Sequence, residues 1–395
     1  MDWLERLASR ARGRQRETAA VPGPSVGVVT DSASALPGGW AEAANAADFV
    51  RVVPMPVMIG DQIYGEGSAE LIPALALAMA QGHEVRTSRP APGQFEAAYR
   101  ELAAAGCTSA VSIHLSGQLS GTVDSARLAA RSAEIPVEVI DSATAAMGLG
   151  FAVAAATERA RAGYSAAEVA ADARSVAADA TILFYVPSLD QLRRGGRIGA
   201  AAGWLGTLLA VKPILVVRDG MVVPLERVRT APKALARLAE LVQQDIAGRD
   251  GKVRAAVHHF GNASEAERLA GIVGAAAPEV EILICPLPAV LAAHAGLGVL
   301  AVAVAGDRSD AAGHIVQGAG PAGAGVPADG VAADGVATDD EGGRTDTGNA
   351  AGKPAGNAAG KPAAPGAASR TRSAETKAKG SKSSGGAKEQ GARRR

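Results

Sequence analysis

Aromatic residues, cysteines and net charge are all scarce in this 395-residue sequence. Only 3% of the residues are aromatic although 48% are hydrophobic, so Ala, Val, Leu and Gly must build most of any core. The 40 basic and 40 acidic residues cancel, and no overall field therefore favours nucleic acid or membrane binding. The length suggests two or three domains, with apolar material for a folded unit of roughly 250–300 residues.

Paired cysteines and an apolar leader segment are also missing. Cys107 and Cys285 each lie beside a strand-like run, without a disulfide framework or zinc spacing. We expect both to be buried small apolar side chains in a reducing, cytoplasmic compartment. The Arg-rich segment 1–20 has no secretion-signal core. The apolar stretches 198–217 and 287–305 contain proline, and we expect a loop followed by a strand, or a buried helix, in each.

Strand-like and helix-like segments alternate from residue 25 to residue 306. This alternation predicts an α/β fold with a largely parallel sheet, most regular before residue 165. A hairpin predicted at Asp219-Gly220 indicates a second domain with a mixed sheet. The expected strands are 25–30, 50–59, 110–114, 137–140, 181–186, 214–217, 253–258, 280–285 and 299–304. The expected helices are 93–105, 120–132, 145–162, 165–178, 233–247 and 264–276. The expected domains are a polar leader 1–24, an N-terminal α/β domain 25–165 and a C-terminal α/β domain 166–306.

Large apolar side chains almost vanish after residue 306. Residues 307–395 include an eight-residue repeat, and such a segment cannot bury enough surface to offset its chain entropy. We therefore expect a disordered tail. Its basic end is able to contact acidic surfaces or nucleic acid, and a solvated tail without a specific partner is the open alternative.

No nucleotide-binding signature is present. Neither Gly-Lys pair of the repeat is followed by Ser or Thr, and the glycine-rich segment 194–199 does not match the dinucleotide fingerprint. The sequence thus predicts no nucleotide site and no cofactor. His258 and His259 end a strand without a partner at metal-ligand spacing, so no metal site is predicted either.

Hydroxyl and carboxyl side chains gather where loops should leave the strands. Ligands of open α/β sheets bind at the carboxyl ends of strands, which makes these loops candidate sites. Asp31 follows the first strand, and we favour a turn-capping role over one in positioning other loops. Asp141 follows a later strand and also has a strong capping interpretation.

Two further hydroxyl segments precede helices. Thr87 and Ser88 lie in a proline-stiffened turn, and Ser120, Gly121 and Thr122 open a helix. Hydroxyls and free N–H groups at a helix start can bind an anion, whereas an ordinary N-cap by Ser120 is the simpler alternative.

His294 lies in an apolar segment flanked by glycine. A single histidine in this setting is more often a satisfied core residue than a catalyst. Together with Ser120 it suggests a lipid hydrolase or acyl transferase, but the sequence has no Gly-x-Ser-x-Gly elbow and no clear acid to orient the imidazole.

The order and spacing of these motifs resemble the DegV family over residues 25–306. The motifs that carry the resemblance are Thr30-Asp-Ser32, the run from Thr87 to Phe95, Leu119-Ser-Gly-Thr122 and Val139-Ile-Asp-Ser142. They also include the run from Leu189 to Ile198, Lys212-Pro-Ile-Leu215 with Asp219-Gly220, and the glycine-flanked His294.

The resemblance implies a lipid carrier with a two-domain fold that encloses a long acyl chain between its domains. Carried over to this sequence, the fatty acid carboxylate would be bound by Thr87, Ser120 and His294. Asp31, Ser88, Gly121, Thr122 and Asp141 would support these residues.

The resemblance also implies a partner protein. A separate ATP-dependent fatty acid kinase, its catalytic subunit, would phosphorylate the carboxylate to an acyl phosphate, with Arg194 and Arg197 on a docking surface. The protein itself would be a carrier rather than an enzyme. A transient contact with a membrane surface is left open.

Overall fold

The computed structural model describes residues 24–40, 46–198 and 211–306. The expected leader, apart from its last residue, and the expected disordered tail lie outside the described residues. Most of the apolar stretch 198–217 lies outside them as well.

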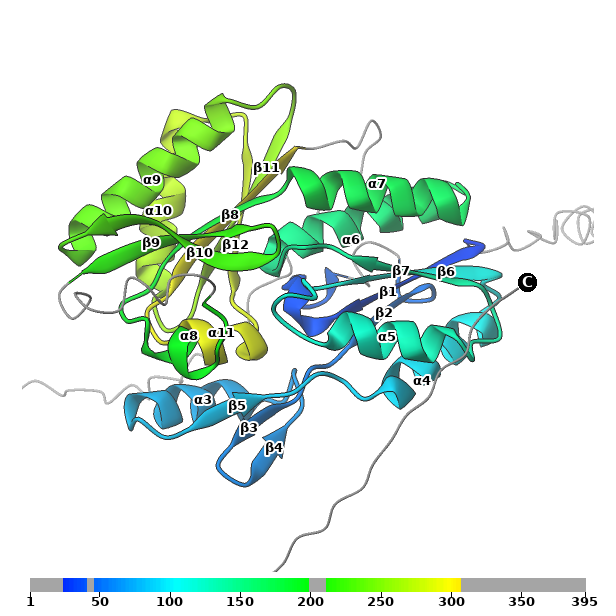
Figure 1. Ribbon diagram of the computed structural model, residues 1–395. Coiled ribbons are helices and arrows are strands. Elements are labelled where there is room, and N and C mark those ends of the chain that lie inside the picture. The colour runs from blue at the N-terminus through cyan, green and yellow to red at the C-terminus, as the bar shows by residue number, and fades with distance from the viewer. Residues whose placement is uncertain (1–23, 41–45, 199–210, 307–395) are drawn as a thin grey trace, which may run out of the picture. The chain divides into compact units, whose positions relative to one another are not determined.

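A parallel four-stranded sheet forms the first part of the fold. Its order is β2 (Val50–Val53), β1 (Val26–Asp31), β6 (Ser109–His114) and β7 (Val137–Asp141), with every neighbouring pair parallel. All six residues of β1 are buried, as expected for a central strand covered on both faces. Helices α4 (Pro92–Ala104) and α5 (Thr122–Ala130) cover one face, and α6 (Ala146–Arg161) and α7 (Ala166–Asp179) cover the other (Figure 1).

A mixed six-stranded sheet forms the second part. Its order is β10 (Met221–Val228), β9 (Lys212–Arg218), β8 (Thr181–Tyr185), β13 (Leu300–Gly306), β11 (Val253–His259) and β12 (Glu281–Pro286). Only β11 and β12 pair in parallel. The predicted hairpin is confirmed between β9 and β10, where Asp219 and Gly220 both have the positive φ of a tight hairpin turn.

The two sheets share the helices α6 and α7 between them. Strand β13 shows why few large side chains are needed between the second sheet and these two helices. Its residues Ala301, Ala303 and Ala305 belong to the core shared with α6 and α7, whereas Leu300, Val302 and Val304 belong to the core under α9 (Ala231–Ala247) and α10 (Ala263–Ala276). The alternation of side chains along a strand thus places small residues on the face toward α6 and α7.

A small antiparallel sheet was not predicted. It consists of β4 (Gln62–Tyr64), β3 (Val57–Ile59) and β5 (Val85–Thr87), in that order, with α3 (Leu71–Ala80) packed against it. The single strand expected over 50–59 is wrong, because the chain leaves the parallel sheet after Val53 and enters the small sheet at Val57. Pro54 and Pro56 separate the two strands, and proline cannot donate a ladder hydrogen bond.

Two short helices, α8 (Asp190–Arg194) and α11 (Ala289–Ala295), are not among the helices expected by range, although a buried helix was one alternative for 287–305. They pack against each other, and α11 also contacts the small sheet and α3. The expectation for the stretch 287–305 is confirmed, since it contains the buried α11 and then β13. None of the helices in the described ranges is long and apolar enough to cross a membrane.

The α/β class, the parallel first sheet and the mixed second sheet are all confirmed. Both cysteines are buried, as predicted. The domain boundary expected near residue 165 falls between α6 and α7, and these two helices pack against each other. The division into two domains at this position stays a prediction.

Candidate functional site

A cavity of about 310 Å³ lies beyond the carboxyl ends of β6 and β7. Its wall is mostly apolar and comes from distant parts of the chain, including Leu115 after β6, Ala145 before α6, Phe184 of β8 and Val290 of α11. Thr87, Ser88, Arg89, Ser120, Arg197 and His294 supply its polar side chains. A mostly apolar cavity with a few convergent polar groups is the usual form of a small-molecule site.

Thr87 and His294 meet in the wall of this cavity. Thr87 ends β5, His294 lies in the last turn of α11, and the Thr87 Oγ1 and His294 Nε2 atoms are 2.8 Å apart. The hydrogen bond joins residues 207 positions apart in the sequence, so the fold alone brings the pair together.

The His294 ring is kept neutral by its surroundings. Burial, reinforced by the positive charge of Arg197, lowers the pKa of His294 to about 4. Gly195, just after α8, leaves room for the ring, because a Cβ atom there would collide with His294 Nδ1. A glycine in the Arg-Gly-Gly-Arg segment therefore has a steric role beside the cavity.

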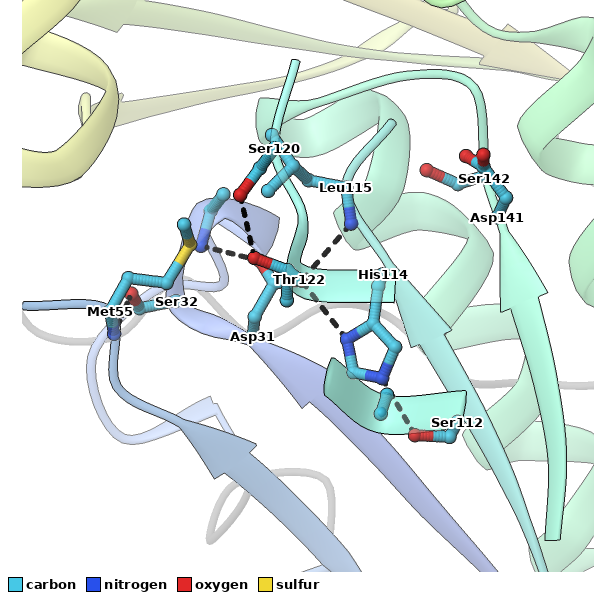
Figure 2. Close-up of polar contacts among 12 residues, drawn as sticks. Asp31, Ser32, Met55, Ser112, His114, Leu115, Ser120, Thr122, Asp141 and Ser142 are labelled. Carbon is cyan, nitrogen blue, oxygen red and sulfur yellow. Dashed lines mark hydrogen bonds and ion pairs between the residues drawn. The ribbon is translucent and has the colours of Figure 1, made fainter. Parts of the chain in front are cut away.

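Ser120 also lines the cavity, just before α5. Its Oγ atom is 2.8 Å from Thr122 Oγ1, and Figure 2 draws this hydrogen bond. The interpretation of Ser120 as the N-cap is wrong, since the N-cap residue is Gly121 and no side chain caps the helix. The Ser120 hydroxyl is thus not committed to a cap.

Arg89 and Arg197 add positive charge to the cavity wall. Arg197 Nε donates to Leu119 O at 2.7 Å, and its Nη1 atom donates to Gly195 O. These bonds fix the guanidinium beside the loop that carries Ser120. Arg89 lies against Gly121, where an added Cβ atom would be 2.7 Å from Arg89 Nη1.

Asp31 connects the loop after β1 to the loop after β6. Its Oδ1 atom accepts from Ala33 N at 3.0 Å, and its Oδ2 atom lies 3.0 Å from both His114 Nδ1 and Leu115 N (Figure 2). The carboxyl group therefore caps the turn, as favoured, and also holds the second loop, which was the alternative. Leu115, which Asp31 fixes, lines the cavity.

A buried chain of hydrogen bonds continues from Asp31. His114 Nε2 is 2.7 Å from Ser112 Oγ, which is 2.9 Å from the hydroxyl of Tyr99. Asp31, Ser112 and His114 are fully buried, and none of them lines the cavity. These hydrogen bonds among Asp31, His114 and Ser112 are therefore structural, because no substrate can reach these buried side chains.

Asp141 joins two loops at the carboxyl ends of β6 and β7. Its Oδ1 atom accepts from Gly117 N at 3.1 Å and from Ala143 N at 3.0 Å. Asp141 caps its turn as expected, but it does not cap α6, whose N-cap residue is Ala145 without a side-chain bond.

The structure gathers most of the predicted site residues. Thr87, Ser88, Ser120, Gly121 and His294 all line the cavity, whereas Asp31, Thr122 and Asp141 do not. Arg194 is exposed outside the cavity, and Arg197, expected on a docking surface, lines the cavity. The part that Arg194 and Arg197 play in docking stays a prediction.

Arg89 and the apolar wall were missed from the sequence. Arg89 stands inside the Thr87–Gly93 motif, so its position was visible although its role was not considered. The wall residues carry no motif signal, because only the fold brings β8, β13 and α11 together.

In the described ranges, no three His, Cys, Asp or Glu residues form a cluster that could hold a metal ion.

The hydrolase alternative requires contact between Ser120 and His294. His294 Nε2 instead bonds Thr87, and Ser120 Oγ bonds Thr122.

His258, which was set aside as a metal ligand, is buried and accepts from Met147 N at 3.2 Å. Burial lowers its pKa to about 4, which suits a neutral structural histidine.

Comparison with known proteins identifies the family. Residues 25–307 match the family model described as "Uncharacterised protein, DegV family". A DegV domain-containing protein of Streptomyces coelicolor is 42% identical over 280 residues, covering 71% of this chain and 98% of that protein. The protein DegV of Bacillus subtilis is 31% identical over 281 residues, covering 70% of this chain and 98% of that protein.

Solved structures agree with the sequence comparisons. A DegV family protein from Thermus thermophilus, whose structure is reported for fatty acid binding, superposes with a TM-score of 0.66 at 34% identity, covering 71% of this chain and 99% of that chain. The structure of DegV from Bacillus subtilis, described as a fatty acid binding protein, superposes with a TM-score of 0.65 at 30% identity, covering 71% and 99%. The chain therefore belongs to the DegV family.

Proposed function

We propose that this protein binds a long-chain fatty acid in the cavity, with the carboxylate held by Thr87, Ser120 and His294. The observation that carries the proposal is the pairing of Thr87 and His294 in the wall of an otherwise apolar cavity. Relatives from Thermus thermophilus and Bacillus subtilis described as fatty acid binding support the same ligand class.

The polar side chains suit a carboxylate. When His294 carries its proton on Nε2, the ring donates to Thr87 Oγ1, and the Thr87 hydroxyl hydrogen is free to donate to the ligand. Ser120 supplies a second hydroxyl and Arg197 a nearby positive charge. A carboxylate leaving water requires several such donors, and charge-assisted hydrogen bonds are the strong ones.

The rest of the cavity suits an acyl chain. Burial of each CH₂ group stabilises the complex by about 0.8 kcal/mol, so an apolar wall alone gives strong retention. Asp31, Thr122 and Asp141 support the carboxylate-binding residues through bonds to the loop after β6, and Ser88 and Gly121 support them from the cavity wall.

The protein would act as a carrier for a separate fatty acid kinase. A carboxylate oxygen of the bound ligand would attack the γ-phosphorus of ATP on the kinase, ADP would leave, and an acyl phosphate would remain on the carrier. Arg194, which is exposed, and Arg197 would contribute to docking of the kinase.

Native mass spectrometry followed by denaturing lipid extraction tests the ligand. We expect one C14–C18 fatty acid per chain, and its loss in a folded Thr87→Ala/Ser120→Ala double variant. Ser188→Ala is the matched control, because Ser188 is exposed and does not line the cavity. A protein that is empty and takes up no added fatty acid would contradict the proposal.

The carrier role has its own measurement. The loaded protein, ATP and a fatty acid kinase are incubated with hydroxylamine, which converts an acyl phosphate into a stable hydroxamate. We expect hydroxamate only when all three components are present. Ester hydrolysis by the protein alone would favour the hydrolase alternative instead.

A further inference from the structure

Helix α11, which carries His294, is held at both ends by the small sheet. At its last turn, His294 bonds Thr87 at the end of β5. At its first turn, Glu66 Oε1 accepts from Ala289 N at 2.7 Å and Glu66 Oε2 accepts from Val290 N at 3.3 Å. Both oxygens of one carboxylate are thus used to hold the helix that presents the histidine.

Glu66 and Thr87 extend from the same end of the small sheet. In the strand register, Val57 of β3 pairs with Tyr64 of β4 on one side and with Thr87 of β5 on the other. Glu66 follows Tyr64 by two residues. The two edge strands lie about 9.5 Å apart, since strands are spaced by about 4.8 Å.

The length of the helix is of the same order as this spacing. From Ala289 to His294 the axis rises about 7.5 Å, at 1.5 Å per residue. Helix α11 packs against β3 and β5, so it lies along the sheet end with its first turn toward β4 and its last turn toward β5. The residue before the helix is Pro288, whose side chain gives no cap, so the first amides of this buried helix turn depend on Glu66.

The environment of Glu66 shows that these two bonds are its main interaction. Glu66 is partly buried, and desolvation raises its pKa although the two amide bonds act in the opposite direction. It forms no salt bridge with a described residue. A carboxylate that is largely withdrawn from water and bonded to two amides of one helix fixes that helix in position.

We propose that Glu66 is a positioning residue for the fatty acid carboxylate, acting through α11 to set the place of the His294 ring against Thr87. This inference rests on the proposed function for its ligand, but the geometry of the ring can be tested without any ligand. Glu66 does not line the cavity of Thr87 and His294 but a different hollow, beside Leu287 and Pro288, so we assign its effect on the ligand site to the helix whose amides it holds.

The first test measures ligand binding in a double-mutant cycle. Glu66→Ala should weaken the affinity for palmitate about tenfold, the size expected for the loss of well-placed hydrogen bonds. In a His294→Gln background the same change should cost less than about twofold, because a residue acting through His294 has nothing left to position. An equal loss in both backgrounds would overturn the proposal.

The second test observes the ring in the ligand-free protein. The ¹⁵N chemical shifts of His294 report which ring nitrogen carries the proton and whether it is hydrogen bonded. We expect them to move in Glu66→Ala and Glu66→Gln, and to stay unchanged in Glu70→Gln, whose exposed carboxyl group caps no helix. Unchanged His294 shifts in both Glu66 variants would overturn the proposal.

The two tests separate this inference from the proposed function. If the intact protein binds no fatty acid, the proposed function fails, and the ring shifts still decide whether Glu66 positions His294. If Glu66→Ala does not fold, Glu66→Gln keeps the size of the side chain and loses the charge, so the cycle can be run with it.

Discussion

Two histidine–hydroxyl pairs in this molecule have nearly the same local geometry and different surroundings. His114 Nε2 lies 2.7 Å from Ser112 Oγ, and His294 Nε2 lies 2.8 Å from Thr87 Oγ1. The first pair is fully buried on strand β6 of the parallel sheet, beside Asp31, and the second lines an apolar cavity. With Asp31, the first pair resembles a catalytic triad, but it is structural. The second pair lacks such a carboxylate and faces the cavity.

This difference indicates that the role of a histidine–hydroxyl pair depends on whether a ligand can reach it. A carboxylate, an imidazole and a hydroxyl in hydrogen-bond contact are chemically competent only where a substrate can reach them. At the buried pair, the polar groups satisfy one another and fix the loop that leads to Leu115. At the cavity pair, the hydroxyl keeps a hydrogen bond to offer.

The largest expected effect concerns the buried pair. Asp31→Ala removes the acceptor for His114 Nδ1 and for the amides of Ala33 and Leu115, so we expect a loss of about 2–5 kcal/mol in the free energy of unfolding. Urea denaturation measures it. Asp141→Ala is the control and should cost less, since Asp141 is exposed. Similar stability of the two variants would contradict the structural role of Asp31.

The next effect concerns the cavity pair. His294→Gln should weaken fatty acid binding by roughly tenfold or more and change the free energy of unfolding by less than the Asp31 variant does. Isothermal titration with palmitate measures the affinity. The control is His83→Gln, because His83 is exposed away from the cavity. Unchanged affinity in His294→Gln would remove His294 from the ligand site.

The third effect is a dependence of stability on pH. Burial lowers the pKa of His294 and of His258 to about 4, below the ordinary value of 6.5. Between these values the unfolded chain binds more protons, so the free energy of unfolding should fall as the pH falls from about 6.5 to 4. Denaturation at a series of pH values measures the slope, and His294→Gln should flatten part of it. A slope unaffected by this substitution would contradict the lowered pKa.

The sequence predicted the layers of the fold because apolar runs and helix periods are local signals. The strand Val26–Asp31 and the hairpin at Asp219-Gly220 follow from composition and turn chemistry alone. The small sheet escaped because its three strands have only three residues each, too short for a period to be recognised. Helix α11 was foreseen only as one alternative for 287–305, because its seven residues lie in a continuous apolar stretch.

The site residues divide in the same way. Thr87, Ser120 and His294 were visible as polar residues in motifs, but their proximity came only from the family resemblance and then from the fold. Glu66 could not be found from the sequence, since its partners are backbone amides more than 220 residues away. The N-cap alternative for Ser120 was wrong, although a serine near a helix start usually caps it, because the helix begins one residue later with Gly121 as its N-cap residue.

The most direct measurement is an NMR titration of ¹⁵N-histidine-labelled, delipidated protein with palmitate. A carboxylate bound beside His294 should shift its ring nitrogens and raise its pKa from about 4, since a nearby negative charge favours the protonated ring. The ring of His114 should not respond, because it is buried away from the cavity. Saturable binding that leaves the His294 signals unchanged would contradict the placement of the carboxylate at Thr87 and His294.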